Sequence, residues 1–419
     1  MWEHSGKVAY AGVGHAEVYR RWNEEAETSL GALAIIAASR AIEDCGLTID
    51  DIDGIFTAPG PLGGEWLPRP IPTSMTNRFF MNNDGNDGIA KVTGHWLARN
   101  MGIDGLKICQ DREAIIGSVL NDAINAVAQG KCHYALVIRP LNNFAGRYEQ
   151  SGANSGDEVG GPGQFQLPYG FTGPARFATM FQRYLWKYNR THDQLADFVV
   201  NNRRNGLMCE YSYYYQNKPE PLSRDEYINA KWICEPVNLY DCDMPVHTAA
   251  AFIITTAERA RYLKQAPAYV LGRAGTHHKA RSVTFTLEDL EETNAEFAGR
   301  LYEDAGINSH EIQFANLYDG FTVVTPLWLE AFGICEKGQA LPWMINENIS
   351  IQGKLPLNTA GGSNGVGRTH GVSLHYDSIL QIQGRAGQRQ VINKDVCIAE
   401  SGPPPDSPGA QILCSSQTT

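Results

Sequence analysis

One glycine-rich run, residues 356–371, has residue types and spacing that suit chemistry on an anionic group. It combines five glycines with Arg368 and His370. Glycine permits positive φ and lets the backbone approach a ligand or another segment closely. Apolar periodicity over residues 372–383 predicts a helix directly after the run. Backbone amides at such a junction suit an anion or a developing oxyanion, although a tight structural turn beside a buried helix explains the same glycines.

Composition limits the partners that the chain can have. It has 419 residues, of which 43% are hydrophobic, and a formal net charge of −11. A chain of this length can bury one large core or two coupled cores. The negative balance argues against nucleic acid or an anionic membrane surface as the main partner. No stretch approaches the ~18 consecutive apolar residues that a membrane-spanning helix needs.

The cysteines form no recognisable metal or redox motif. There are nine of them, scattered along the chain, and none stands in a C-x-x-C pair. The sequence therefore encodes neither a zinc ribbon nor a thioredoxin-like pair. An odd number without a disulfide framework is typical of reduced thiols inside a cell. We expect a cytoplasmic protein that binds no metal and no separate cofactor.

The elements that must position the glycine-rich run are predicted to alternate between strand and helix. In the first ~140 residues the pattern is βαβαβ, typical of a sheet with helices on both faces. Residues 140–241 differ, with glycine- and asparagine-rich loops, two helices over 177–188 and 192–205, and a run at 211–215 that contains four tyrosines. We interpret this segment as an insertion. Its tyrosines are either rigid interface packing or a platform on which a ring system stacks.

An internal repeat gives the strongest evidence on domain organisation. Residues 43–52 match residues 303–312 at a constant offset of 260, and both copies join a helix through glycine to a short acidic turn and a strand. Repeats of this kind indicate duplicated architecture. We predict an N-terminal half over residues 1–265, with an insertion at about 140–241, and a C-terminal half over residues 266–419.

This layout resembles the thiolase superfamily, and three motifs carry the resemblance. They are Leu-Tyr-Asp-Gly-Phe-Thr at 317–322, Leu-Glu-Ala-Phe-Gly-Ile-Cys-Glu-Lys-Gly at 329–338 and Pro-Leu-Asn-Thr-Ala-Gly-Gly at 356–362. The chain is most similar to the sterol carrier protein x, or lipid-transfer protein, branch. The resemblance implies an α/β fold, a thiolase-like five-layer αβαβα sandwich of two duplicated βαβ halves. It also implies a homodimer acting on acyl-CoA thioesters.

The family's cysteine machinery is missing. Counting back from the end of the predicted helix 113–129 places Glu113 where the family has its nucleophilic cysteine, and Cys109 lies four residues earlier, inside a predicted strand. Cys397 is out of register with the second family cysteine. The pattern is closer to the steroid side-chain aldolases, thiolase-like proteins that lack these cysteines and cleave a β-hydroxyacyl-CoA by a retro-aldol step. These aldolases typically pair with a small OB-fold and zinc-ribbon (DUF35-type) subunit, so the resemblance implies a heterotetramer.

A retro-aldol step needs a base for the β-hydroxyl proton and donors for the thioester oxygen. Tyr318 follows a predicted strand at 312–317, where open α/β sheets place their sites, and we predict it as the base. Arg368 or a protonated His370 would lower the pKa of its phenol. Amides of Gly361, Gly362 and Gly367 would hold the enolate, with coenzyme A present as part of the substrate. Asp319 is expected to bond loop N–H groups.

Three further residues are candidates for the site, and Glu113 is a second candidate for the base. His247 either faces the substrate or is a satisfied core histidine, and Tyr169 lies in a Pro-Tyr-Gly-Phe loop. Glu113 is either a buried base with a raised pKa or a charge that complements the helix dipole. Two other functions stay open at this stage: acyl transfer through Cys109, and a non-catalytic lipid-binding subunit.

Overall fold

The computed structural model describes residues 1–22, 29–59, 87–89, 91–143, 173–275, 286–403 and 409–417. Its central feature is one nine-stranded sheet with the order β3-β2-β4-β7-β1-β8-β11-β10-β9. The first five positions belong to the N-terminal half, and the last four to the C-terminal half. The N-terminal strands are β1 (Val8–His15), β2 (Gly54–Thr57), β3 (Ile108–Asp111), β4 (Tyr134–Leu141) and β7 (Thr248–Thr256). The C-terminal strands are β8 (Ala268–Gly275), β9 (Phe314–Asn316), β10 (Val396–Ser401) and β11 (Gly409–Cys414).

The two halves repeat one topology. In the first half β2 pairs parallel with β4, and β7 pairs antiparallel with both β4 and β1. In the second half β9 pairs parallel with β10, and β11 pairs antiparallel with both β10 and β8. The halves meet where Ala9 and Tyr10 of β1 pair antiparallel with Tyr269 and Ala268 of β8. The duplicated βαβ architecture expected from the sequence is therefore confirmed.

The sequence repeat is preserved in hydrogen bonds as well as in strand order. The 3-10 turns Ile49–Asp51 and Ser309–Glu311 keep the offset of 260, and each begins with a capping box. Asp44 and Asp304, also 260 apart, each bond a backbone amide 31 residues earlier. The amides are those of Val13 at 3.0 Å and Arg273 at 3.1 Å.

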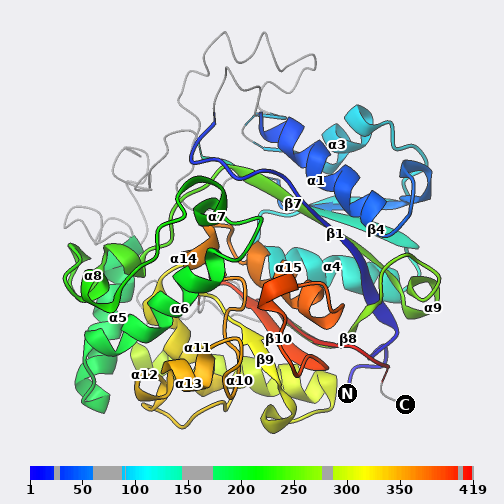
Figure 1. Cartoon of the computed structure of the whole chain (residues 1–419). Coiled ribbons are helices and arrows are strands. Elements are labelled where there is room, and N and C mark those ends of the chain that lie inside the picture. Colours follow the sequence, from blue (N-terminus) through cyan, green and yellow to red (C-terminus); the bar gives the residue numbers. More distant parts are fainter. Residues whose placement is uncertain are drawn as a thin grey trace, which may run out of the picture.

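Helices cover the sheet in three layers, which gives the five-layer sandwich (Figure 1). Helices α1 (Leu30–Asp44) and α3 (Gly94–Met101) pack on the outer face of the N-terminal strands. Helices α4 (Ile116–Ala128) and α15 (Val372–Ile382) lie between the two halves of the sheet. Helices α10 (Leu287–Ala305) and α11 (Thr325–Ala331) cover the outer face of the C-terminal strands. Each helical layer shares one hydrophobic cluster with the strands beside it.

Small residues bring the first helix close to the sheet. A Cβ on Gly12 of β1 would lie 2.5 Å from the carbonyl oxygen of Ala41, and one on Gly14 would collide with the carbonyl of Ala37. Glycine on the strand and alanine on the helix thus allow a backbone approach that larger side chains would prevent. Ser29 caps α1 by accepting from the amide of Ala32 at 3.2 Å.

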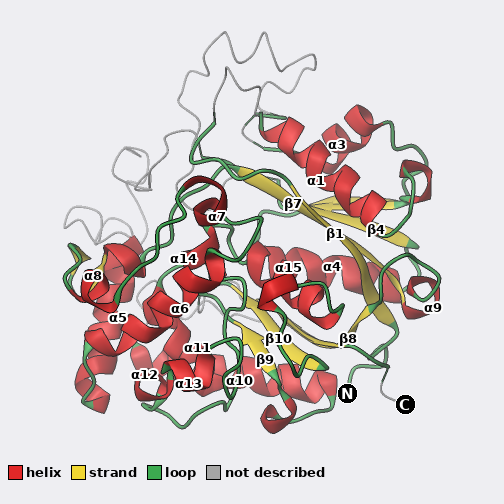
Figure 2. Cartoon of the chain, viewed as in Figure 1, coloured by secondary structure: helices red, strands yellow, loops and turns green. Residues whose placement is uncertain are grey.

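The segment between β4 and β7 is mostly helical, as expected for an insertion (Figure 2). Its helices are α5 (Gly173–Tyr188), α6 (Ala196–Gly206), α7 (Tyr213–Asn217) and α8 (Arg224–Ile228), and it ends in a hairpin of β5 (Trp232–Cys234) and β6 (Val237–Asn238). Short helices complete the chain: α9 (Ala257–Ala260), α12 (Ala340–Trp343), α13 (Asn346–Ile349) and α14 (Gly362–Val366). The tyrosine run serves packing, because Tyr211 donates to Asp377 at 3.2 Å and Arg203 stacks on Tyr214. It therefore offers no free stacking platform at these two rings.

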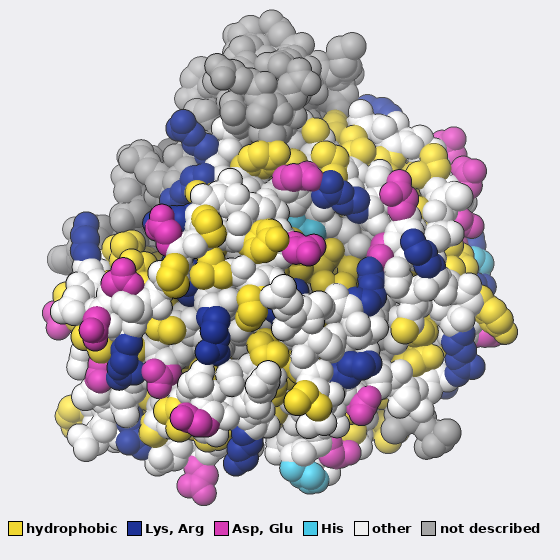
Figure 3. Space-filling view, in the orientation of Figure 1, with side chains coloured by type: hydrophobic (Ala, Val, Ile, Leu, Met, Phe, Trp, Pro, Cys, Tyr) yellow, Lys and Arg dark blue, Asp and Glu magenta, His cyan; other side chains and the backbone are white. Residues whose placement is uncertain are grey.

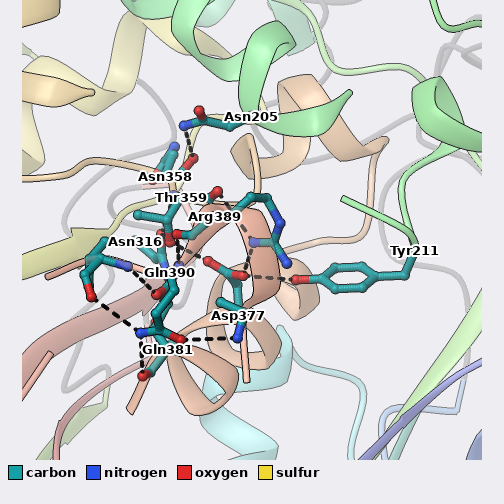
Figure 4. A network of polar contacts seen from close by, with 12 residues as sticks. Asn205, Tyr211, Asn316, Asn358, Thr359, Asp377, Gln381, Arg389 and Gln390 are labelled. Atoms are coloured by element: carbon teal, nitrogen blue, oxygen red, sulfur yellow. Dashed lines mark hydrogen bonds and ion pairs between the residues drawn. The ribbon is translucent and has the colours of Figure 1, made fainter. Parts of the chain in front are cut away.

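A buried carboxylate fixes the glycine-rich run against helix α15 (Figure 4). Asp377 is fully buried and accepts from the hydroxyls of Thr359 and Tyr211 and from the guanidinium of Arg389. Arg389 also donates to the backbone oxygen of Thr359 at 3.3 Å. One carboxylate thus joins the start of the glycine-rich run, the insertion and the segment after α15.

We predict that Asp377→Asn lowers the free energy of unfolding by about 3–5 kcal/mol, because it leaves the Arg389 charge buried without a counter-charge. Urea unfolding followed by circular dichroism measures this change. Glu288→Gln is the matched control, since Glu288 pairs with Arg183 where both side chains are 45–47% exposed; such a pair contributes about 1 kcal/mol or less. Equal stability of the two variants would contradict the role given to Asp377.

Candidate active site

Tyr318 lies in the turn after β9, where the sequence placed it. Its side chain is buried, with 6% exposed. Its amide donates to Glu400 Oε2 at 3.0 Å, and its carbonyl oxygen accepts from the hydroxyl of Thr325 at 2.9 Å. These bonds fix the backbone of the turn from β10 and from α11. Burial raises the pKa of the phenol well above 10, so Tyr318 is neutral at rest.

Asp243 and Arg368 lie beside this phenol. A Cβ on Gly320 would collide with Tyr318 Oη and lie 2.9 Å from Asp243 Oδ2, so the missing side chain leaves room for both groups. Asp243 is 2% exposed, and its Oδ1 lies 3.9 Å from Arg368 Nε. The Asp243 amide donates to the carbonyl of Gly320 at 3.0 Å, and the Arg368 amide donates to Met244 at 2.7 Å. These two bonds attach the end of the segment between β4 and β7 to the loop that carries Tyr318 and to the loop that carries Arg368.

His370 is also part of this group, but in its neutral form. Its Nδ1 lies 2.9 Å from Nη2 of Arg139, a buried residue of β4. Burial lowers the pKa of His370 well below 6.5, and the charges of Arg368 and Arg139 lower it further. The prediction of a protonated His370 is therefore wrong. Since Arg139 can only donate, Nδ1 accepts and the ring hydrogen resides on Nε2.

Most amides of the glycine-rich run are bonded within the fold, which corrects the enolate-binding role expected for Gly361 and Gly367. Residues 362–366 form the short helix α14, and its amides at Ser363 and Asn364 donate to Asp319 at 2.7 and 3.1 Å. Asn202 donates to the same carboxylate at 2.9 Å. Burial raises the pKa of Asp319 to about 7, opposed by these amides. Asp319 thus bonds loop N–H groups, as the sequence analysis expected.

The three glycines proposed for substrate binding have positive φ and closely packed surroundings. Their φ values are 103° at Gly361, 63° at Gly362 and 120° at Gly367. The amide of Gly361 donates to the carbonyl of Asn358 at 2.7 Å, and that of Gly367 donates to the carbonyl of Ser363 at 2.9 Å. Both donors are engaged in the fold. The positive φ values show why glycine is required here.

Two of the other candidates, Glu113 and His247, have no catalytic place in this group. Glu113 is exposed and precedes helix α4, which begins at Ile116 rather than at 113, so the buried base proposed for it is wrong. His247 is fully buried: its Nδ1 accepts from the amide of Asn143 at 3.2 Å, and its backbone pairs with Tyr19. It is a satisfied core histidine. Tyr169 lies outside the described residues.

Sequence reasoning missed two acidic groups. Asp243 stands in a Tyr-Asp-Cys-Asp-Met stretch whose carboxylates gave no periodic signal. Glu400 is fully buried at the carboxyl end of β10, and its Oε1 has no hydrogen-bond partner among the described residues. Burial, with the nearby charge of Asp319, raises the pKa of Glu400 well above 4.5. The signal available for Glu400 was its place in the strand where the family would have a cysteine.

Neither Cys109 nor Cys397 is poised as a nucleophile. All nine are free thiols. Cys109 is half-buried on edge strand β3, with Sγ 3.4 Å from His95 Nδ1, and burial raises its pKa to about 11. Cys397 is fully buried, and burial raises its pKa as well. A thiolate nucleophile needs the opposite shift.

Comparison with known proteins agrees with this geometry. A family model described as thiolase C-terminal domain-like matches residues 275–403. The solved structure of an Ltp2-ChsH2(DUF35) aldolase superposes with a TM-score of 0.78 at 25% identity, covering 99% of each chain. The chain has the thiolase fold. Human mitochondrial 3-ketoacyl-CoA thiolase shares the fold alone, with a TM-score of 0.66 at 10% identity over 98% of each chain.

Two curated proteins that are similar to this chain are lyases by name. The steroid side-chain-cleaving aldolase of Thermomonospora curvata is 28% identical over 90% of this chain and 91% of its own length. The 17-hydroxy-3-oxo-4-pregnene-20-carboxyl-CoA lyase of Mycobacterium tuberculosis is 29% identical over 91% of this chain and 92% of its own length. The resemblance to steroid side-chain aldolases is therefore confirmed, and it covers nearly the whole chain.

Three further observations concern the surface charge, the helices and the metal-ligating residues of the chain. On the face shown in Figure 3, basic and acidic side chains are interspersed rather than gathered by sign. In the described part of the chain, no helix has the length and apolarity needed to cross a membrane. Among these same residues, no group of three or more His, Cys, Asp and Glu side chains could hold a metal ion.

We predict that Cys109 is not required for turnover by this protein. With a pKa of about 11, about one thiol in ten thousand is ionised at neutral pH. Alkylation of Cys109 by iodoacetamide, followed by mass spectrometry, should be slow at pH 7 and accelerate as the pH rises. Cys109→Ala should change turnover by less than about threefold. Rapid alkylation at pH 7, or a hundredfold loss of activity in a folded variant, would contradict this.

Proposed function

We propose that this protein is a carbon–carbon lyase, an aldolase that cleaves a β-hydroxyacyl-CoA by a retro-aldol step. Its products would be a ketone or aldehyde and a shorter acyl-CoA. The observation that carries the proposal is the juxtaposition of Tyr318, Asp243 and Arg368 in a fold without a reactive cysteine. The names of the relatives support a steroid or similarly bulky acyl chain. Acyl transfer through Cys109, the alternative, lacks an ionised thiol.

The neutral state of Tyr318 refines its role as general base. A phenol whose pKa is well above 10 is not ionised at neutral pH. It accepts the β-hydroxyl proton only if it passes its own proton on. Asp243, across Gly320 from the phenol oxygen, is the acceptor that we assign to that proton. The C–C bond electrons then move onto the thioester oxygen as an enolate.

Two cationic or N–H groups are available for the enolate oxygen. His370 carries its hydrogen on Nε2, because Nδ1 faces Arg139 at 2.9 Å. Arg368, 3.9 Å from Asp243, adds a positive charge that is 10% exposed. In a water-poor site such donors stabilise developing negative charge strongly. These side chains replace the loop amides that the sequence suggested.

Tyr318→Phe should reduce cleavage about 10²–10⁴-fold, the usual effect of losing general acid–base catalysis. Product analysis by mass spectrometry on steroid β-hydroxyacyl-CoA substrates measures this. Phe keeps the ring packing, and Tyr318 Oη has no hydrogen bond among the described contacts that it would break, so thermal stability should hardly change. Tyr302→Phe is the matched control, since Tyr302 is a mostly buried tyrosine whose hydroxyl bonds only the Phe332 carbonyl, at 2.7 Å.

The proposed proton transfer from Tyr318 to Asp243 gives a second prediction for the same assay. Asp243→Asn should cost a similar factor, because the phenol then has no acceptor for its proton. Wild-type turnover by Tyr318→Phe would remove Tyr318 from the mechanism. A wild-type protein that binds acyl-CoA but cleaves none of the substrates, alone or with a partner, would favour the non-catalytic lipid-binding subunit instead.

We also propose a homodimer that recruits a small DUF35-type partner, giving a heterotetramer. The similar Ltp2-ChsH2(DUF35) aldolase structure, whose name includes a DUF35 component, supports this assembly. Light scattering of the protein alone should give twice the chain mass of 46.1 kDa. Mixing with a candidate partner should add mass and raise turnover. A stable monomer that gains neither on mixing would count against the assembly.

A further inference from the structure

We infer that Glu400 is the acid that protonates the α-carbon of the enolate after C–C cleavage. This assignment rests on the proposed retro-aldol function. It identifies the source of the proton that the α-carbon gains after cleavage. The cleavage step leaves a carbanion equivalent next to the thioester, and that carbon must gain a proton before the shorter acyl-CoA can leave. Tyr318 and Asp243 hold the proton taken from the β-hydroxyl, so a second group is needed at the α-carbon.

The position of Glu400 meets the geometric requirement. The β-oxygen and the α-carbon of the substrate are two bonds apart, so the base and the acid must be close neighbours. Glu400 Oε2 accepts from the backbone amide of Tyr318 at 3.0 Å. Glu400 stands at the carboxyl end of β10, which pairs directly with β9, the strand that leads into Tyr318. The two side chains therefore start from adjoining strand ends.

The hydrogen bonds distinguish Glu400 from Asp319, a neighbouring carboxyl group in the same turn. Asp319 accepts from two amides of α14 and from Asn202, so its oxygens are occupied by the fold. Glu400 Oε1 has no partner among the described residues, although the side chain is 0% exposed. A buried polar atom without a partner is costly and calls for an explanation. A substrate atom that arrives during turnover supplies one.

The protonation state fits the same role. Burial raises the pKa of Glu400 well above 4.5, so the group holds a proton. Because Oε2 already accepts from Tyr318, that proton belongs on Oε1. In the step that we assign, the Oε1–H bond breaks, its hydrogen forms the new C–H bond at the α-carbon, and Glu400 becomes a carboxylate. Proton transfer from Asp243 through solvent restores both groups, so no further reactant is required.

The test uses the reverse half-reaction, which needs no C–C chemistry. In that direction the carboxylate form of Glu400 takes a proton from the α-carbon, so the exchange rate should rise with pH. The full-length protein, with its partner if one is required, is incubated in D₂O with acetyl-, propionyl- and butyryl-CoA. Mass spectrometry follows deuterium uptake at the α-carbon. Wild-type protein should catalyse exchange. Glu400→Gln keeps an acceptor for the Tyr318 amide but cannot transfer a proton, and it should lower exchange about 10²–10⁴-fold.

Two controls separate catalysis from structure. Glu330→Gln should leave exchange unchanged, since Glu330 is another acid whose pKa burial raises, with an unpartnered Oε2, but it bonds Tyr184 and Ala340. Tyr318→Phe should lose cleavage while keeping exchange within several-fold. If Glu400→Gln fails to fold, Glu400→Asp, which withdraws the acid by one methylene, should slow exchange about tenfold.

The outcomes are distinguishable. Exchange at the wild-type rate in a folded Glu400→Gln or in Glu400→Asp would overturn the inference, as would cleavage by a wild-type protein that catalyses no exchange. Exchange that depends on Glu400 in a protein that cleaves no β-hydroxyacyl-CoA would uphold Glu400 and refute the proposed aldolase function instead.

Discussion

A single buried carboxylate, Asp377, carries the arrangement from which the candidate site is built. Thr359, Tyr211 and Arg389 all bond it, and they come from the glycine-rich run, the insertion and the segment after α15. A buried charge is tolerated only when its partners hold a fixed geometry. That requirement sets the start of the glycine-rich run, and the positions of Arg368 and His370 follow from it.

The two halves of the sheet make unequal contributions to the candidate site. The duplicated halves give the sheet its symmetry, but Tyr318, Arg368, His370 and Glu400 all come from the second half. The first half contributes Arg139 from β4 and, through the end of the insertion, Asp243. The segment between β4 and β7 therefore contributes a side chain to the candidate site. It brings the Asp243 carboxylate to the turn that follows β9.

Desolvation is the common cause of the electrostatic properties of this region. It keeps Tyr318 and Glu400 protonated and His370 neutral, although arginine and carboxylate charges lie close by. A neutral phenol or carboxylic acid is a weak base, but it can accept one proton while it donates its own to a neighbouring group. The proposed chemistry consequently uses a relay and a separate acid, where a solvent-exposed site would use one ionised base.

The sequence by itself determined the fold, because the repeat at an offset of 260 and the motifs around Tyr318 and Gly361 are local patterns that survive duplication. It also placed Tyr318 at a strand exit and assigned Asp319 to loop amides. Only the tertiary structure decided which groups meet. Burial makes His370 neutral, the exposed position of Glu113 excludes it as a buried base, and the amides of Gly361 and Gly367 are bonded within the fold. Asp243 and Glu400 became visible only there, because their environment depends on contacts between segments far apart in the chain. Tyr318 and Glu400, for example, are 82 positions apart, and no local pattern encodes such a contact.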